Sequence, residues 1–260
     1  MWYNYVLMVH NVSTKPQRVN LLGIGTDPVT MEQAIQLIQY FIEEGQPHHI
    51  VTCDASMVVM AQADPALGDI VRKAALVTPD SVGILWACKK LATAMPERVS
   101  GVDIVQRLVA LSAQPNGPRL FFLGAAPGIA DAAAERMREI CPGAQIVGSA
   151  HGYFTESDEP EVIRTIQAAK PDVLCVALGI PKQEKWIAKH ANECGVPVLI
   201  GVGGTFDVLS GRVKRAPKLF QKLSIEWVWR LVSNPSKIAK VSLLPRFAWM
   251  VLTAKQPKGD

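Results

Sequence analysis

The sequence predicts an α/β fold, in which parallel β-strands are flanked by helices and are followed by a basic helical appendage at the C-terminus. Strand-length apolar runs alternate with stretches of helical periodicity over most of the 260 residues, and such alternation favours parallel pairing with helices on both faces. The uneven distribution of charge indicates a separate appendage. The chain has 27 Lys/Arg and 23 Asp/Glu, and residues 212–260 contain 11 of the Lys/Arg but only 2 of the Asp/Glu. The body therefore has a net charge of −5 and the appendage +9.

The first half of the chain begins with an arm and continues with strand–helix units. Residues 1–18 lack the basic start, long apolar stretch and cleavage site of a secretory signal, and are predicted to form a flexible arm. Thr30 is a favoured cap for a helix that continues to Glu44, with Ala34 and Ile38 on its apolar face. The other predicted elements are strands at 19–25, 49–52 and 74–77 and helices from about residue 54, from about residue 81 and over 101–112.

The second half follows a linker near residues 114–118, where Pro, Asn and Gly interrupt the pattern. After it, the predicted strands cover 119–124, 144–148, 173–179 and 198–203, and the predicted helices cover 128–140, 160–169 and 181–193. Residues 19–211 are thus predicted to form a Rossmann-like catalytic core in two halves. Residues 212–260 are predicted to be helical and basic, and we expect them to meet an anionic surface or ligand.

Composition excludes several classes of protein. With 49% hydrophobic and 19% charged residues the chain is not globally disordered, and no apolar run approaches the roughly 20 residues of a membrane-spanning helix. The five cysteines are widely spaced and odd in number, which excludes a disulfide framework and favours a cytoplasmic protein. The chain has no Asp-x-Asp pair and no histidine ligand pattern, so we expect neither a metal ion nor a cofactor.

Polar residues follow several predicted strands, at the carboxyl ends where parallel sheets bind their ligands. Asp80 is suited to take a proton from a sugar hydroxyl, and equally suited to cap the next helix. Thr52 and Asp54 end another strand, where each can bind a polar substrate or cap a helix. Arg98 precedes a Gly-containing turn and can hold a phosphate through its planar fork, or lie solvated on the surface.

Glycines and polar groups occupy the strand ends of the second half. Gly124 lies in a turn whose N–H groups could approach a diphosphate, or that is simply tight; the full dinucleotide fingerprint and a Walker lysine are absent. Gln183 lies between Lys182 and Glu184 at a polar helix start, which is either a binding site or a solvated first turn. Gly203 belongs to a cluster of three glycines that implies close approach by a ligand or another backbone.

Several blocks in this order resemble the WecG/TagA/CpsF glycosyltransferases, glycosyltransferase family 26, over about residues 22–247. The blocks are Pro79-Asp80 with Gly83, Glu97-Arg98-Val99 with Gly101 and Asp103, His151-Gly152-Tyr153-Phe154, Leu178 through Glu184, Gly201 through Asp207, Arg215-Ala216-Pro217, and Glu226-Trp227 through Arg230. The third block adds Tyr153 to the expected substrate-binding residues.

The resemblance implies an inverting enzyme of bacterial cell-surface polysaccharide biosynthesis that needs no essential metal. Its donor would be a UDP-sugar carrying N-acetylmannosamine, its uronic acid or a hexose, and its acceptor an undecaprenyl-diphosphate-linked sugar. The resemblance assigns Asp80 as general base and places Thr52, Arg98 and Gln183 in the substrate pocket. An inverting transfer needs such a base on the acceptor side and positive charge near the leaving diphosphate.

The resemblance also implies that the appendage folds over the active site and docks on the inner face of the bacterial membrane, an anionic surface. The positions expected to meet diphosphate are Arg230, Lys237 and Lys240. At the last two the family often has arginine, and lysine keeps the charge but loses the bidentate fork. Ser81 stands where the family usually has glycine and Asp54 where it usually has asparagine, and both departures concern the sugar pocket and not the type of reaction.

Two other classes of function stay open from the residues alone. One is another sugar-nucleotide enzyme, such as an epimerase or a dehydrogenase, although a dehydrogenase should carry a full glycine fingerprint that neither half shows. The other is a nucleic-acid-binding protein whose paired aromatics, Trp227 and Trp229 among them, stack on bases. Tryptophan with Lys/Arg also suits a membrane interface, and the acidic body has no basic groove. We therefore expect no nucleic-acid partner, and leave open whether the protein forms a homo-oligomer.

Overall fold

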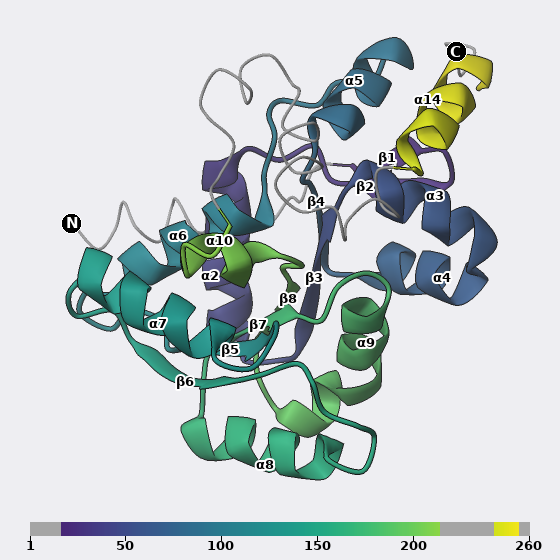
Figure 1. Cartoon of the computed structure of the whole chain (residues 1–260). Coiled ribbons are helices and arrows are strands. Elements are labelled where there is room, and N and C mark those ends of the chain that lie inside the picture. The colour runs from purple at the N-terminus through teal and green to yellow at the C-terminus, as the bar shows by residue number, and fades with distance from the viewer. Residues whose placement is uncertain (1–16, 214–241, 255–260) are drawn as a thin grey trace.

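The computed structural model describes residues 17–213 and 242–254, and it confirms the predicted α/β fold (Figure 1). Its centre is a six-stranded sheet in the order β4-β3-β8-β7-β5-β6, in which every neighbouring pair is parallel. The strands are β3 His48–Cys53, β4 Leu76–Pro79, β5 Leu120–Gly124, β6 Ile146–Ala150, β7 Val173–Ala177 and β8 Val198–Gly201.

The two predicted halves of the chain contribute to this one sheet. The join is the pairing of β3 with β8, in which Ile50 lies opposite Ile200. Because all six strands run in the same direction, their carboxyl ends lie along one edge of the sheet. The predicted polar residues at strand ends are therefore brought to that edge.

Helices cover both faces of the sheet, as the strand–helix alternation predicts (Figure 1). Phe122 packs in the cluster that includes α2, α6, α7 and α10, whereas its neighbours Phe121 and Leu123 pack in the cluster that includes α8 and α9. This change of face at each successive residue is the pleat of a β-strand buried on both sides. The helices are α2 Met31–Glu44, α3 Ala55–Ala63, α4 Pro65–Lys73, α5 Val82–Lys90, α6 Gly101–Ser112, α7 Ile129–Ile140, α8 Glu159–Ala169, α9 Lys182–Cys194, α10 Thr205–Leu209 and α14 Leu244–Thr253.

One predicted strand is wrong. Residues 19–25 form a tight antiparallel hairpin of two short strands, β1 Val19–Leu21 and β2 Ile24–Thr26, instead of a single strand. Leu22 and Gly23 have φ angles of 54° and 86°, and two consecutive left-handed residues reverse the chain in a way that suits the twist of a hairpin. The Asn20 side chain accepts the Gly23 N–H at 2.8 Å and stabilises the turn. The other predicted strands and helices through residue 203 agree with the structure to within two residues at each end.

The last described helix, α14, packs on the body of the protein. Figure 1 shows it beside α3 and α5, and its Phe247 and Val251 are each only 3% exposed within their cluster. Trp249 and Leu252, on the other side of the same helix, are each 66% exposed. The helix therefore contributes to the core on one side and presents apolar groups to the surroundings on the other. No helix in the described ranges is both long and apolar enough to cross a membrane.

Candidate active site

The carboxyl ends of β3 and β8 are joined by a side chain that the sequence singles out. The Thr52 hydroxyl donates a hydrogen bond to the carbonyl oxygen of Gly201 at 2.7 Å, and the bond is buried. Thr52 is the next-to-last residue of β3 and Gly201 is the last residue of β8. This contact therefore connects the first half of the chain to the second at the edge where ligands are expected.

Asp80 follows β4 directly, and the prediction that it could cap the next helix is wrong. The cap of α5 is Ser81, whose hydroxyl oxygen accepts the Ile84 N–H at 3.4 Å and also the Ala55 N–H at 3.3 Å. One oxygen of the half-buried Asp80 carboxylate instead accepts the N–H of Gly101 at 3.1 Å. Asp80 thus lies at the N-terminus of α6, a helix that begins more than 20 residues later in the sequence.

Arg98 reaches the same helix end. The segment before α6 runs beside the end of β4, where the Val99 N–H donates to the carbonyl oxygen of Pro79 at 2.9 Å. The guanidinium of Arg98 lies 3.6 Å from the carboxylate of Asp103, in the first turn of α6, and its side chain is 21% exposed. An arginine held in this way is not the solvated surface residue that was the alternative interpretation. The structure therefore brings Arg98 and Asp80 to one helix N-terminus.

Gly101 also lies beside Thr52. A Cβ atom added to Gly101 would make ordinary contacts with Cγ2 of Thr52, at 3.4 Å, and with Oγ1 of Thr205, at 3.6 Å. Thr205 is buried and donates to the carbonyl oxygen of Val202 at 2.7 Å. The sequence analysis did not select Thr205, and its only signal was its place directly after the glycine cluster.

Asp54 is a helix cap, one of its two predicted roles. Its Oδ1 accepts the Met57 N–H at 2.9 Å and the Ser56 hydroxyl at 2.6 Å at the start of α3. Its position also adds negative charge to the site. Burial raises the pKa of the Cys53 thiol well above its ordinary value, and the carboxylates of Asp54, Asp80 and Glu184 raise it further. The buried thiol therefore stays protonated.

Gln183 is buried, not part of a solvated helix start, and it connects two glycine turns. Its Oε1 accepts the N–H of Gly179 at 3.1 Å and the N–H of Gly203 at 3.0 Å, while its Nε2 donates to Oε1 of Glu184 at 2.7 Å. A carbonyl oxygen has two lone pairs, and both are used here. Because Gln183 is 1% exposed, its amide serves the protein's own backbone in this structure. Glu184, fully buried beside it, was not selected by the sequence analysis.

Gly124 and Gly203, the other two predicted glycines, occupy different surroundings. A Cβ atom at Gly124 would lie 2.5 Å from backbone atoms of Ala177, so this glycine allows β5 and β7 to come together at their ends. Gly203 has a φ of +55°, and an added Cβ atom would meet no atom of the described residues within 4 Å. The close approach that the sequence predicts is therefore made by another backbone at Gly124, whereas no described residue fills the space beside Gly203.

Tyr153 lies in a loop that returns from the edge strand β6 towards α9. The Gly152 N–H donates to the carbonyl oxygen of Ala125 at 2.8 Å, and the Phe154 ring lies 6.3 Å from that of Trp186. Tyr153 is 73% exposed between these contacts. It is thus placed near the ends of β5 and β7, whereas Asp80 follows β4 at the opposite end of the strand order.

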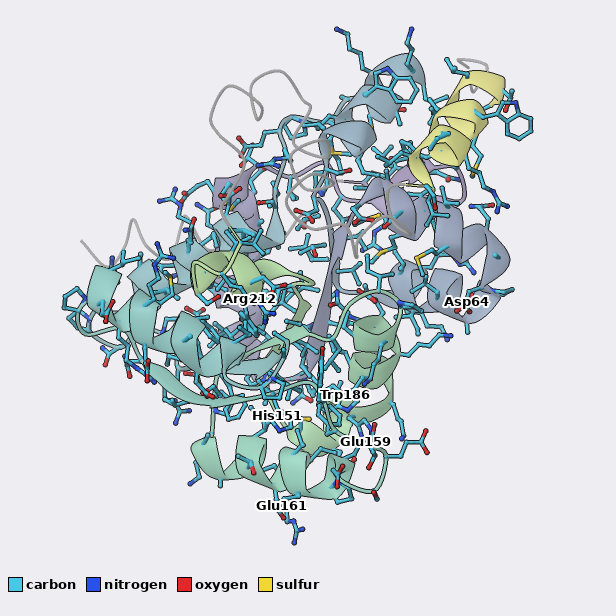
Figure 2. All side chains as sticks on the ribbon, in the orientation of Figure 1. Asp64, His151, Glu159, Glu161, Trp186 and Arg212 are labelled. Atoms are coloured by element: carbon cyan, nitrogen blue, oxygen red, sulfur yellow. The ribbon has the colours of Figure 1, made fainter. Side chains whose placement is uncertain are left out.

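A separate groove of about 540 Å³ lies between this loop and the outer face of α9. Figure 2 shows Glu159 and Trp186, which line it, near the facing helices α8 and α9. The ammonium groups of its lysines are engaged: Lys189 with Glu159 at 2.7 Å and Lys185 with Asp64 at 2.6 Å. The groove includes none of the residues gathered around Gly101 and Gln183.

The predicted phosphate-binding residues of the appendage, Arg230, Lys237 and Lys240, lie outside the described residues. Over residues 17–213 and 242–254, no group of three or more His, Cys, Asp or Glu residues is arranged so that it could hold a metal ion.

The sequence is similar to that of a known family of enzymes. Residues 19–259 match the family model described as "Glycosyl transferase WecG/TagA/CpsF family". Curated relatives include the N-acetylglucosaminyldiphosphoundecaprenol N-acetyl-beta-D-mannosaminyltransferases of Staphylococcus aureus strains MRSA252 and NCTC 8325 / PS 47. Each is 31% identical over 241 residues, which cover 92% of this chain and 94% of the relative.

Proposed function

Because the chain belongs to the WecG/TagA/CpsF family of glycosyltransferases, we propose that it transfers N-acetylmannosamine from a UDP-sugar to an undecaprenyl-diphosphate-linked sugar. The observation that carries this proposal is the convergence of Asp80, Arg98 and Thr52 on the N-terminus of α6. It places a carboxylate and a guanidinium at the carboxyl edge of the sheet, where the nucleotide of an α/β enzyme binds.

In the proposed reaction Asp80 is the general base. Its carboxylate takes the proton from the attacking hydroxyl of the acceptor, the hydroxyl oxygen forms a bond to the anomeric carbon, and the bond from that carbon to the diphosphate breaks. Attack from the side opposite the leaving group inverts the anomeric centre. The Gly101 N–H and the dipole of α6 favour the ionised carboxylate before the proton arrives.

The leaving UDP carries negative charge that must be stabilised. We assign this role to Arg98 and to the basic appendage residues Arg230, Lys237 and Lys240. The appendage would bring these groups to the site when it docks on the inner face of the membrane, where a polyprenyl acceptor lies. Catalysis would then depend on the surface that holds the acceptor.

The charge of the site favours N-acetylmannosamine over its uronic acid. Asp54 and Asp80 place two carboxyl groups directly after β3 and β4, and a negatively charged sugar would be repelled there. The names of the Staphylococcus aureus relatives agree with a neutral amino sugar as the transferred group and with an N-acetylglucosaminyl lipid as the acceptor. A hexose is the neutral alternative, and the experiment below includes it.

The experiment is a donor screen with the purified full-length protein. UDP-N-acetylmannosamine, its uronic acid and UDP-glucose are each incubated with a synthetic N-acetylglucosaminyl-diphosphate polyprenol, and the lipid product is identified by mass spectrometry. Transfer from UDP-N-acetylmannosamine is expected, with the anomeric configuration inverted by NMR. The absence of product from every donor contradicts the proposal. Conversion of a UDP-sugar without acceptor identifies an epimerase instead.

A further inference from the structure

The first turn of α9 contains a buried carboxyl group, Glu184, that the proposed mechanism does not use. The residue has no exposed surface, and its Oε1 accepts the Gln183 amide at 2.7 Å. Gln183 in turn accepts the N–H groups of Gly179 and Gly203, the turns that follow β7 and β8. A carboxyl group is costly to bury unless its contacts repay the lost hydration, so this arrangement calls for a role.

We propose that Glu184 is a positioning residue. By holding the amide of Gln183, it fixes the two glycine turns against which the UDP-sugar donor binds. This inference rests on the proposed function, because it assigns a part of the site to the donor.

The hydrogen bonds explain why Glu184 is needed. Oε1 of Gln183 already accepts two backbone N–H groups, so the orientation of the amide is set and Nε2 must point away from the turns. Nε2 then needs an acceptor, and Glu184 supplies it. If this acceptor is removed, a buried N–H group is left unsatisfied. Rotation of the amide towards another acceptor then lowers the free energy, and any such rotation weakens the hydrogen bonds that it accepts from the N–H groups of Gly179 and Gly203.

The neighbouring strand leaves room for this pair and for no larger group. A Cβ atom on Gly201 would lie 2.6 Å from Nε2 of Gln183 and 3.1 Å from Oε1 of Glu184. Gly201 is also the residue whose carbonyl oxygen binds Thr52. The pair is therefore packed against the strand end that Thr52 joins to β3.

Among residues 17–213 and 242–254, nothing covers the outer surfaces of the two turns. Gly179 and Gly203 have φ angles of +79° and +55°, and a Cβ atom added to either would meet no atom of these residues within 4 Å. Both turns lie at the carboxyl ends of adjacent central strands, the usual place of the nucleotide in a parallel sheet. Asp80, which takes the proton from the acceptor hydroxyl, follows β4, two places from β8 in the strand order. The donor is therefore the substrate whose binding depends on Glu184.

The test compares Glu184→Met, which keeps the length of the side chain and loses the acceptor, with Glu184→Gln, which keeps an acceptor oxygen. Glu184→Met is expected to raise the KM for the UDP-sugar about ten-fold, the effect of one unsatisfied buried donor, with the acceptor KM little changed. Glu184→Gln is expected to bring the donor KM back to within about three-fold of wild type. Hydrogen exchange at the N–H groups of Gly179 and Gly203 should be faster in Glu184→Met than in wild type.

The matched control is Glu159→Met. Glu159, labelled in Figure 2, is also largely buried and binds α8 to α9 through His190 at 3.0 Å and Lys189 at 2.7 Å. Its loss is expected to lower the Tm without changing the donor KM. A Glu184→Met enzyme that behaves in the same way has lost only stability, and that result overturns the proposal.

The experiment distinguishes failure of the proposed function from failure of the role assigned to Glu184. If Glu184→Met does not fold, Glu184→Asp takes its place, because a side chain one methylene shorter withdraws the acceptor; an unchanged donor KM in that variant also overturns the proposal. If wild-type protein transfers no sugar from any donor, the proposed function fails first. If wild type transfers sugar and the variants bind the donor normally, only the role of Glu184 fails.

Discussion

Replacing Asp80 by asparagine removes the proposed proton acceptor while leaving its helix contact in place. The amide oxygen of asparagine can still accept the Gly101 N–H, which Asp80 binds at 3.1 Å. At this contact the fold therefore loses the attraction between a charge and the N-terminus of α6, worth about 0.3–1 kcal/mol. The loss of a general base costs about 10²–10⁴-fold in turnover, or roughly 3–5 kcal/mol of barrier. Catalysis should thus suffer far more than stability.

The assay measures the initial rate of transfer at saturating donor and acceptor, urea unfolding, and UDP binding by calorimetry. Asp64→Asn is the matched control, because Asp64 caps α4 by accepting the Leu67 N–H at 3.2 Å and lies outside the site. It should keep turnover to within about two-fold, since its ion pair with Lys185 is on the surface. An Asp80→Asn enzyme that folds, binds UDP and retains more than about a tenth of wild-type turnover would refute the assignment of Asp80 as the base.

Three further predictions concern the metal, the membrane and the last helix. EDTA should leave turnover unchanged, because Arg98 and the appendage are assigned to the diphosphate; a loss that magnesium or manganese restores would show that a metal holds it instead. A Lys237→Gln/Lys240→Gln variant should sediment with anionic vesicles about 30-fold more weakly than wild type, since each lysine contributes about 1 kcal/mol, and the difference should shrink as salt is added. Equal sedimentation of the two proteins would place membrane contact elsewhere. Phe247→Ala should lower the free energy of unfolding by about 3–5 kcal/mol in urea titrations, because this ring is 3% exposed and its centroid lies 6.4 Å from that of Trp86. A loss of less than about 1 kcal/mol would mean that α14 is not part of the stable body.

Most elements of this fold could be predicted because local interactions specify them. Thr30 and Gln33 form a reciprocal capping box at the start of α2, and Gly45 ends the same helix in the left-handed conformation. The apolar runs of β5 and β7 are buried along their whole length, as strands covered on both faces must be. The hairpin at residues 19–26 was missed, because its turn begins with Leu22, a residue that local preference rarely places at a positive φ.

The sequence by itself determined which residues stand at strand ends, and so identified Thr52, Asp80, Arg98 and Gln183 as candidates. Their partners were decided by the tertiary structure. Thr52 binds Gly201, 149 positions away, because β8 pairs with β3, and Asp80 binds Gly101 because residues 97–101 return to the end of β4. Local preference could not distinguish Asp80 from Ser81 as a helix cap, since both residue types cap well. Strand order depends on burying both faces of the whole sheet at once, and that requirement, which no short segment contains, places the carboxylate, the guanidinium and the glycine turns at one edge.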